Sequence, residues 1–112
     1  MRRVRLVVAY DGTNYCGWQI QPNGITIEEV LNREISRLTR EDIHIIGASR
    51  TDSGVHALGN VAVFDTASSV PPERMAYALN QRLPGDIVIV RSDEAASDWH
   101  PRYQDEIAKT YE

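Results

Sequence analysis

The chain has 112 residues and a formal net charge of −4, with 42% hydrophobic and 25% charged residues. This length suits one domain with a modest core, and the composition is typical of a globular protein. No apolar run is long enough to cross a membrane, and the basic start at residues 1–5 leads into an alternating pattern rather than the apolar stretch of a secretory signal. We therefore predict a cytoplasmic protein.

Cysteine and histidine usage argues against a disulfide or a metal site. Cys16 is the one cysteine of the sequence, and the three scattered histidines show no ligand spacing. The negative net charge argues mildly against a nucleic-acid partner, because proteins that bind polyanions usually carry a basic patch. All but one of the twelve Lys and Arg residues are Arg, however, and the planar guanidinium suits phosphate and stacked bases. Charge alone leaves the partner open.

The first third of the chain predicts a strand followed by a helix. Residues 3–10 alternate between two faces, as a half-buried strand does. The apolar face of this strand consists of Val4, Leu6, Val8 and Tyr10. Residues 26–40 place apolar side chains at helical spacing, and Thr26 with Glu29 forms the capping box that begins a helix. The charged residues that lie mostly off the apolar stripe are expected to face solvent, namely Glu28, Glu29, Arg33, Arg37 and Arg40.

The middle of the chain predicts two more strands and a second helix. Residues 43–48 and 60–65 are short apolar runs bounded by turn residues, which indicates strands. The second helix is expected to begin at Pro71-Pro72, since proline is tolerated in the first turn, and to end at Pro84-Gly85. Its apolar stripe is Met75, Ala76, Leu79 and Leu83.

A fourth strand at residues 87–90 completes the order β-α-β-β-α-β. This order predicts an α+β, ferredoxin-like fold, with an antiparallel sheet and two helices on one face. We expect residues 1–92 to form this unit. Residues 93–112 are expected to begin the connection into a further, C-terminal half.

One stretch between two predicted strands concentrates reactive side chains. Residues 47–57 read Gly-Ala-Ser-Arg-Thr-Asp-Ser-Gly-Val-His-Ala. Arg50 and Asp52 would point the same way on an extended segment, and a guanidinium that near lowers the pKa of a carboxylate. An Asp between Thr and Ser-Gly is also a common turn residue, whose side chain bonds to nearby backbone N–H groups. The residue types alone leave both interpretations open.

The stretch resembles the GRTDxGVHA motif of the TruA family of tRNA pseudouridine synthases, with Ser49 in place of a glycine and Ser53 in place of an alanine. Other segments resemble the same family in the same order. They are Tyr10-Asp11-Gly12-Thr13-Asn14-Tyr15, Gly17-Trp18-Gln19, Ala78-Leu79-Asn80 and Leu83-Pro84. The resemblance implies the pseudouridine synthase fold, in which the predicted unit occurs twice, and it identifies this chain with the N-terminal half.

The resemblance implies an isomerase that converts uridine to pseudouridine in the anticodon stem-loop of tRNA, at about positions 38 to 40. It assigns the catalytic role to Asp52 and the stacking on the extruded base to Tyr111. Arg50 is placed to fill the space that the extruded base leaves. The carboxylate acts either as a nucleophile or as a base that removes a proton from the sugar, and both routes stay open. The roles of Arg102 and Tyr103 also stay open.

The expected reaction needs no cofactor or metal, because the N1–C1′ bond breaks and a C5–C1′ bond forms without net gain or loss. The resemblance implies tRNA as partner, a homodimer, and an active cleft between the two halves, so that the 112-residue chain alone is expected to be inactive.

Two other functions are compatible with this order of elements, a non-catalytic RNA-binding module and a ligand-binding regulatory domain. The clustered aromatic residues of an RNA-recognition motif are absent from residues 60–64, where Phe64 is the one aromatic residue. A ligand-binding domain would not need Arg-Thr-Asp between glycines. We therefore favour the synthase.

Overall fold

Four antiparallel strands and two helices make up the computed structural model, which describes residues 1–22, 24–48, 54 and 57–101. The strands are β1 (Arg2–Tyr10), β2 (Ile46–Gly47), β3 (Ala57–Thr66) and β4 (Ile87–Ala95). The helices are α1 (Ile27–Thr39) and α2 (Met75–Asn80), with 3-10 turns η1 (Gly12–Asn14) and η2 (Pro72–Arg74). The strand order β2-β3-β1-β4, with each neighbouring pair antiparallel, confirms the predicted ferredoxin-like fold.

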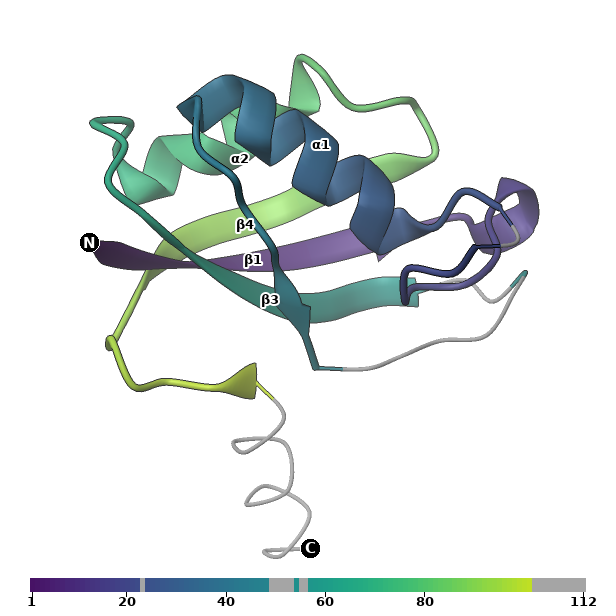
Figure 1. Cartoon of the computed structure of the whole chain (residues 1–112), viewed down its shortest axis with the longest axis horizontal. Helices are drawn as coiled ribbons and strands as arrows, with labels where there is room; N and C mark the ends of the chain where they lie inside the picture. Colours follow the sequence, from purple (N-terminus) through teal and green to yellow (C-terminus); the bar gives the residue numbers. More distant parts are fainter. Residues whose placement is uncertain (23, 49–53, 55–56, 102–112) are drawn as a thin grey trace, which may run out of the picture.

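Both helices cover one face of the sheet, and the residues that follow β4 turn toward the other face (Figure 1). The predicted apolar face of β1 is buried beneath the helices, from Val4 to Tyr10. The same core contains Trp18, Ile27, Leu31, Ile35, Phe64, Met75, Leu79, Ile87 and Ile89. Burial of this continuous apolar layer is the main contribution that holds the helices on the sheet.

Helix α1 begins where the capping box predicts. The Thr26 hydroxyl accepts a hydrogen bond from the backbone N–H of Glu29 at 3.3 Å, which satisfies one of the free donors of the first turn. The helix ends at Thr39, and the C-cap residue Arg40 has the left-handed conformation with φ of 59°.

Strand β2 is shorter than the predicted strand at residues 43–48, because side chains of α1 replace a strand partner. The backbone N–H of Ile43 donates to the Ser36 hydroxyl at 3.0 Å, and that of Ile45 donates to the Asn32 side-chain oxygen at 2.8 Å. Both isoleucines are still buried. The apolar pattern therefore predicts the burial of this segment correctly but not its hydrogen bonding.

The second helix is shorter and the last strand longer than predicted. The segment that begins at Pro72 is first a 3-10 turn, and regular α-helix ends at Asn80. Strand β4 continues past residue 90 to Ala95, because β1 offers partners along its whole length. The predicted division at residue 92 falls within this strand, and the connection into a further half stays a prediction.

Asn80, the last residue of α2, joins this helix to β4 through its side chain. Its side-chain amide donates to the backbone oxygen of Ile89 at 2.9 Å, and its side-chain oxygen accepts from the Ile89 N–H at 2.8 Å. These two bonds imitate a neighbouring strand at the outer edge of β4. They satisfy backbone groups that the described part of the sheet leaves without a strand partner.

Candidate active site

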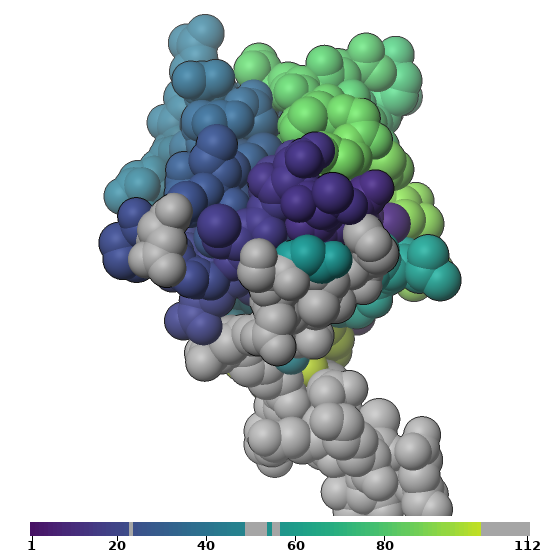
Figure 2. All heavy atoms as spheres, turned by 90° about the vertical axis from the view of Figure 1, so that its right-hand side faces the viewer, coloured from purple at the N-terminus to yellow at the C-terminus, as the bar shows by residue number. Residues whose placement is uncertain are grey.

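The candidate site lies at the end of the sheet where β1 finishes and its two neighbours begin. Tyr10, the last residue of β1, pairs with Ala57 at the start of β3 and with Ile87 at the start of β4. Figure 2 shows this end of the molecule. The segment after β1, in purple, lies between the blue segment that leads into α1 and the green part of the chain. Teal residues at the start of β3 lie beside it. The motif stretch 47–57 leads into this end, because it joins β2 to β3.

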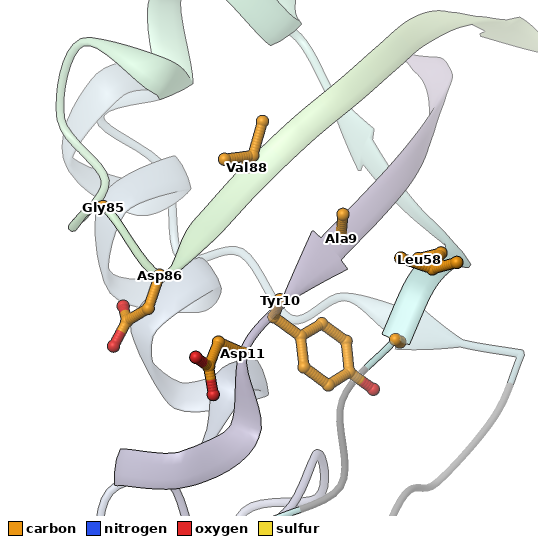
Figure 3. Close-up of a pocket in the computed structure, with 8 residues that line it drawn as sticks. Ala9, Tyr10, Asp11, Leu58, Gly85, Asp86 and Val88 are labelled. Atoms are coloured by element: carbon orange, nitrogen blue, oxygen red, sulfur yellow. The ribbon is translucent and has the colours of Figure 1, made fainter.

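A pocket of about 330 Å³ opens at this end of the sheet. It is lined by Ala9, Tyr10, Asp11, Ala57, Leu58, Gly85, Asp86 and Val88. Figure 3 shows Asp11 and Asp86 close together on one side and Leu58 on the other, with Ala9 and Val88 along the strands between them. The pocket therefore combines an apolar floor with carboxylates on one wall, a composition that suits a ligand with both a flat apolar part and polar groups.

The described ends of the motif stretch are fixed by backbone contacts. A Cβ atom at Gly47 would lie 2.6 Å from the Trp18 ring, so only glycine fits there without displacing the indole. The Ala48 N–H donates to the Val61 oxygen at 2.7 Å, and the Gly54 N–H donates to the Tyr15 oxygen at 3.3 Å. Gly54 has a φ of 78°, a backbone conformation that favours glycine.

The predicted site residues Arg50, Asp52 and Tyr111 lie outside the described residues, as do Arg102 and Tyr103. Their roles therefore stay predictions. What the structure does describe is the frame on both sides of Arg50 and Asp52, namely Gly47, Ala48, Gly54 and Ala57.

The turn after β1 forms one wall of the pocket. The Asp11 carboxylate accepts from the Thr13 N–H at 3.0 Å and so caps η1, which agrees with a turn role for this residue. The Asp11 N–H donates to the Asp86 backbone oxygen at 2.9 Å and joins this turn to the start of β4. Tyr10 and Asp11 thus both line the pocket.

Tyr15 connects the turn after β1 to Asp86 through its side chain. Its ring is 8% exposed, and its hydroxyl donates to the Asp86 carboxylate at 2.6 Å. Burial raises the pKa of Tyr15 above its ordinary value, and the hydrogen bond to the Asp86 carboxylate raises it further. Tyr15 therefore stays a neutral hydrogen-bond donor at physiological pH.

Trp18 is fully buried and belongs to the core rather than to the pocket. Its ring packs beside Tyr10, with centroids 5.8 Å apart, and its indole nitrogen has no hydrogen-bond partner among the described residues. Trp18 therefore packs in the core, where its ring is not exposed to a ligand.

Sequence reasoning assigned five of the pocket residues to no site, namely Ala9, Leu58, Gly85, Asp86 and Val88. Asp86 precedes the fourth predicted strand, and the antiparallel fold alone would have brought that point to the end of β1. Leu58 is 94% exposed beside a register shift between β1 and β3, and no local pattern predicts such an irregularity.

Arginines on the face of the sheet opposite the helices are paired with carboxylates. Arg3 bonds to Asp65 at 2.8 Å, and Arg5 bonds to Asp93 at 2.5 Å. Each guanidinium holds the pKa of its carboxyl partner below the ordinary value. The Arg5 guanidinium also lies 5.0 Å from the centre of the Trp99 ring, so the segment after β4 packs on this face.

Among the described residues, no group of three or more His, Cys, Asp or Glu side chains is arranged to hold a metal ion. No helix in the described ranges has the length and apolar character needed to span a membrane.

The fold and the pocket define an α+β domain with a loop-framed site at one end of its sheet, a class that contains both enzymes and binding modules. Comparison with protein families identifies which of these the chain resembles. Residues 6–104 match the model of the tRNA pseudouridine synthase family, and the chain belongs to that family.

Individual relatives agree with this assignment. The chain is 55% identical over 104 residues to a tRNA pseudouridine synthase A of Acetivibrio thermocellus, which covers 93% of this chain and 43% of the relative. It is 52% identical over 103 residues to the enzyme of that name from Thermoanaerobacter sp. (strain X514), covering 92% and 42%. A tRNA pseudouridine synthase A 2 of Clostridium perfringens is 50% identical over 111 residues, covering 99% and 45%. The chain thus spans less than half the length of these relatives.

Proposed function

We propose that this chain supplies the catalytic carboxylate of a tRNA pseudouridine synthase, and that Asp52 is that carboxylate. The observation that carries the proposal is the family match over residues 6–104, which includes the whole stretch 47–57. The pocket supports it as well, because Ala57 belongs both to the motif stretch and to the pocket wall.

The proposed reaction is the isomerisation of uridine to pseudouridine in the anticodon stem-loop of tRNA. The N1–C1′ bond of the nucleoside breaks, the uracil turns, and C5 forms the new bond to C1′. The hydrogen on C5 leaves as a proton and N1 gains one, so atoms and electrons balance. Asp52 assists either by attacking as a nucleophile or by removing a proton from the sugar.

Arg50 and Tyr111 complete the proposed site. Extruding a base from its stack requires a few kcal/mol, and a planar guanidinium can occupy the vacated space. An aromatic ring can stack on the extruded base and hold it in place. We assign the first role to Arg50 and the second to Tyr111.

We further propose that the full-length protein works as a homodimer in the cytoplasm with tRNA as its partner. The names of the relatives support the substrate class, and the family resemblance supports the dimer. Light scattering of the purified full-length protein tests the dimer independently of any activity measurement.

The proposal is tested by incubating the full-length protein with unmodified tRNA and mapping pseudouridine by sequence position. The wild type should modify uridines in the anticodon arm, and Asp52→Asn should abolish the modification while tRNA binding persists, because an amide is a far poorer nucleophile and base. Asp42→Asn is the matched control, since Asp42 is a solvent-exposed carboxylate outside the motif.

Two results would contradict the proposal. Modification by Asp52→Asn at the wild-type rate would show that another residue performs the chemistry. Binding of tRNA by the wild type without any isomerisation would favour the RNA-binding module instead.

A further inference from the structure

Tyr15 connects three segments that surround the pocket. Its hydroxyl donates to the Asp86 carboxylate at 2.6 Å, and its backbone oxygen accepts from Gly54 at 3.3 Å. Its own N–H donates to the Gly12 oxygen at 3.1 Å, within the turn after β1. One residue thus joins the start of β4, the turn after β1 and the end of the motif stretch.

We propose that the Tyr15–Asp86 hydrogen bond positions the motif stretch for catalysis, which makes Tyr15 and Asp86 positioning residues for the isomerisation. This inference rests on the proposed function, because it takes Asp52 as the group that must be positioned. It assigns a role to two residues that need not contact the substrate base.

A short series of contacts, all between described residues, connects Asp86 to the motif stretch. The Asp86 carboxylate accepts a hydrogen bond from the Tyr15 hydroxyl, and burial of the tyrosine restricts the Tyr15 backbone. The Tyr15 backbone oxygen accepts a hydrogen bond from the Gly54 N–H. Gly54 follows Asp52 by two residues, and two residues of backbone span at most about 7 Å. The hydrogen bond to Gly54 therefore acts within two residues of Asp52 along the chain.

The start of β4 is itself fixed by backbone hydrogen bonds and burial, so it can restrain Tyr15. Asp86 accepts through its backbone oxygen from the Asp11 N–H at 2.9 Å, and the next residue, Ile87, is buried and paired with β1. The hydrogen bond also joins a carboxyl oxygen to a phenol hydroxyl at the short distance of 2.6 Å. Asp86 lines the pocket, so the same bond also fixes part of the pocket wall.

Loss of this bond should lower the turnover number more than it weakens tRNA binding. Misplacement of a reacting group by about 1 Å is enough to reduce a rate by about a hundredfold, whereas most contacts with a large RNA lie outside the pocket. Tyr15→Phe keeps the buried ring and removes only the hydroxyl. Asp86→Ala removes the acceptor and leaves the tyrosine ring unchanged.

The experiment measures kcat and KM for isomerisation of an unmodified tRNA transcript by the full-length protein. We expect Tyr15→Phe and Asp86→Ala each to lower kcat about tenfold to a hundredfold, with KM within about twofold of wild type. The double variant should be no slower than the slower single variant, because both changes break one bond. Asp86→Asn should restore most of kcat, since its side-chain oxygen can still accept from the phenol.

Tyr77→Phe is the matched control, because Tyr77 is 73% exposed on α2 and lies outside the pocket lining. It should turn over like the wild type. Each rate is divided by the folded fraction at the assay temperature, so that a change in stability alone does not register as a change in kcat. If Tyr15→Phe fails to fold, the pair Asp86→Ala and Asp86→Asn decides the question, since neither alters the buried ring.

Wild-type kcat in Tyr15→Phe, strictly additive effects in the double variant, or equal losses in Asp86→Ala and Asp86→Asn would overturn the inference. Failure of the proposed function is recognised separately through Asp52→Asn. If Asp52→Asn is inactive while Tyr15→Phe is fully active, only the positioning role is wrong. If Asp52→Asn is active, the catalytic assignment of Asp52 is wrong whatever Tyr15→Phe does.

Discussion

The indole of Trp18 packs directly against the backbone of Gly47, at the residue where the motif stretch begins. A Cβ atom built on Gly47 would lie 2.6 Å from both Cε2 and Nε1 of the ring. Trp18 is fully buried, so the ring has no free space into which it could move. Gly47, the first residue of the motif stretch, is therefore required by the packing of the core.

Gly47→Ala should destabilise the protein by about 1–3 kcal/mol, because the added methyl group forces a shift of a rigid, buried ring. Urea unfolding of the 112-residue chain, followed by tryptophan fluorescence, measures the effect. Gly85→Ala is the control, since a Cβ atom there meets no atom within 4 Å. Equal stability of the two variants would show that the indole adapts to the methyl group.

Asn80→Ala should lower the free energy of unfolding by about 1–3 kcal/mol. The change leaves the N–H and the oxygen of Ile89 without their partner at the edge of β4. Alanine is the better helix former, which offsets a few tenths of a kcal/mol. Gln81→Ala, at an exposed position next to Asn80, is the control and should change stability little. A wild-type unfolding midpoint in Asn80→Ala would show that water replaces the amide without loss.

Stability should fall at acid pH because Asp65 and Asp93 have lowered pKa values in the folded chain, through their bonds to Arg3 and Arg5. The unfolded chain binds protons at a higher pH than the folded chain does. The stabilising contribution is therefore fully present above the unfolded pKa of about 4, and it is lost as pH falls through the lowered values.

Urea unfolding between pH 7 and pH 2 measures this dependence. The double variant Asp65→Asn/Asp93→Asn should show a flatter decline than wild type across the acid range, because it lacks both titrating groups. Both carboxylates are partly exposed, with side-chain exposures of 45% and 38%, so added salt should also weaken the effect. A wild-type pH dependence in the double variant would contradict these assignments.

The sequence predicts a helix or strand of this fold correctly where a local pattern is enough to specify it. The alternation from Val4 to Tyr10 and the cap at Thr26 are local features, and the structure confirms both. The extent of β2 could not be predicted, because Asn32 and Ser36 of α1 take up the backbone groups of the expected strand. Whether a side chain or a neighbouring strand bonds to these backbone groups depends on tertiary packing.

One part of the candidate site could be predicted from the sequence, and the other part could not. The motif around Asp52 is contiguous in sequence, so the family resemblance alone was enough to propose it. Asp86 lies far from the motif in sequence and reaches Tyr15 only through the antiparallel arrangement of β1 and β4. Contacts of this kind carry no local signal and require the fold.

The 112-residue chain should fold cooperatively but form no pseudouridine by itself. Its core is continuous across both helices and strands β1, β3 and β4, which supports independent folding. Its relatives are more than twice as long, and the family resemblance predicts an active cleft between two halves. Circular dichroism tests the folding and pseudouridine mapping tests the activity. Turnover by the chain alone at the rate of the full-length protein would contradict a cleft shared between two halves.

The most direct test of the account follows the hydrogen on C5, since the proposed chemistry replaces the C5–H bond with a C5–C1′ bond. Unmodified tRNA transcribed with tritium at C5 of uridine is incubated with the full-length wild type or with Asp52→Asn, and tritium released into water is counted. We predict release by the wild type, equal in amount to the pseudouridine formed, and none by Asp52→Asn. Equal release by both proteins would contradict the claim that Asp52 catalyses the isomerisation.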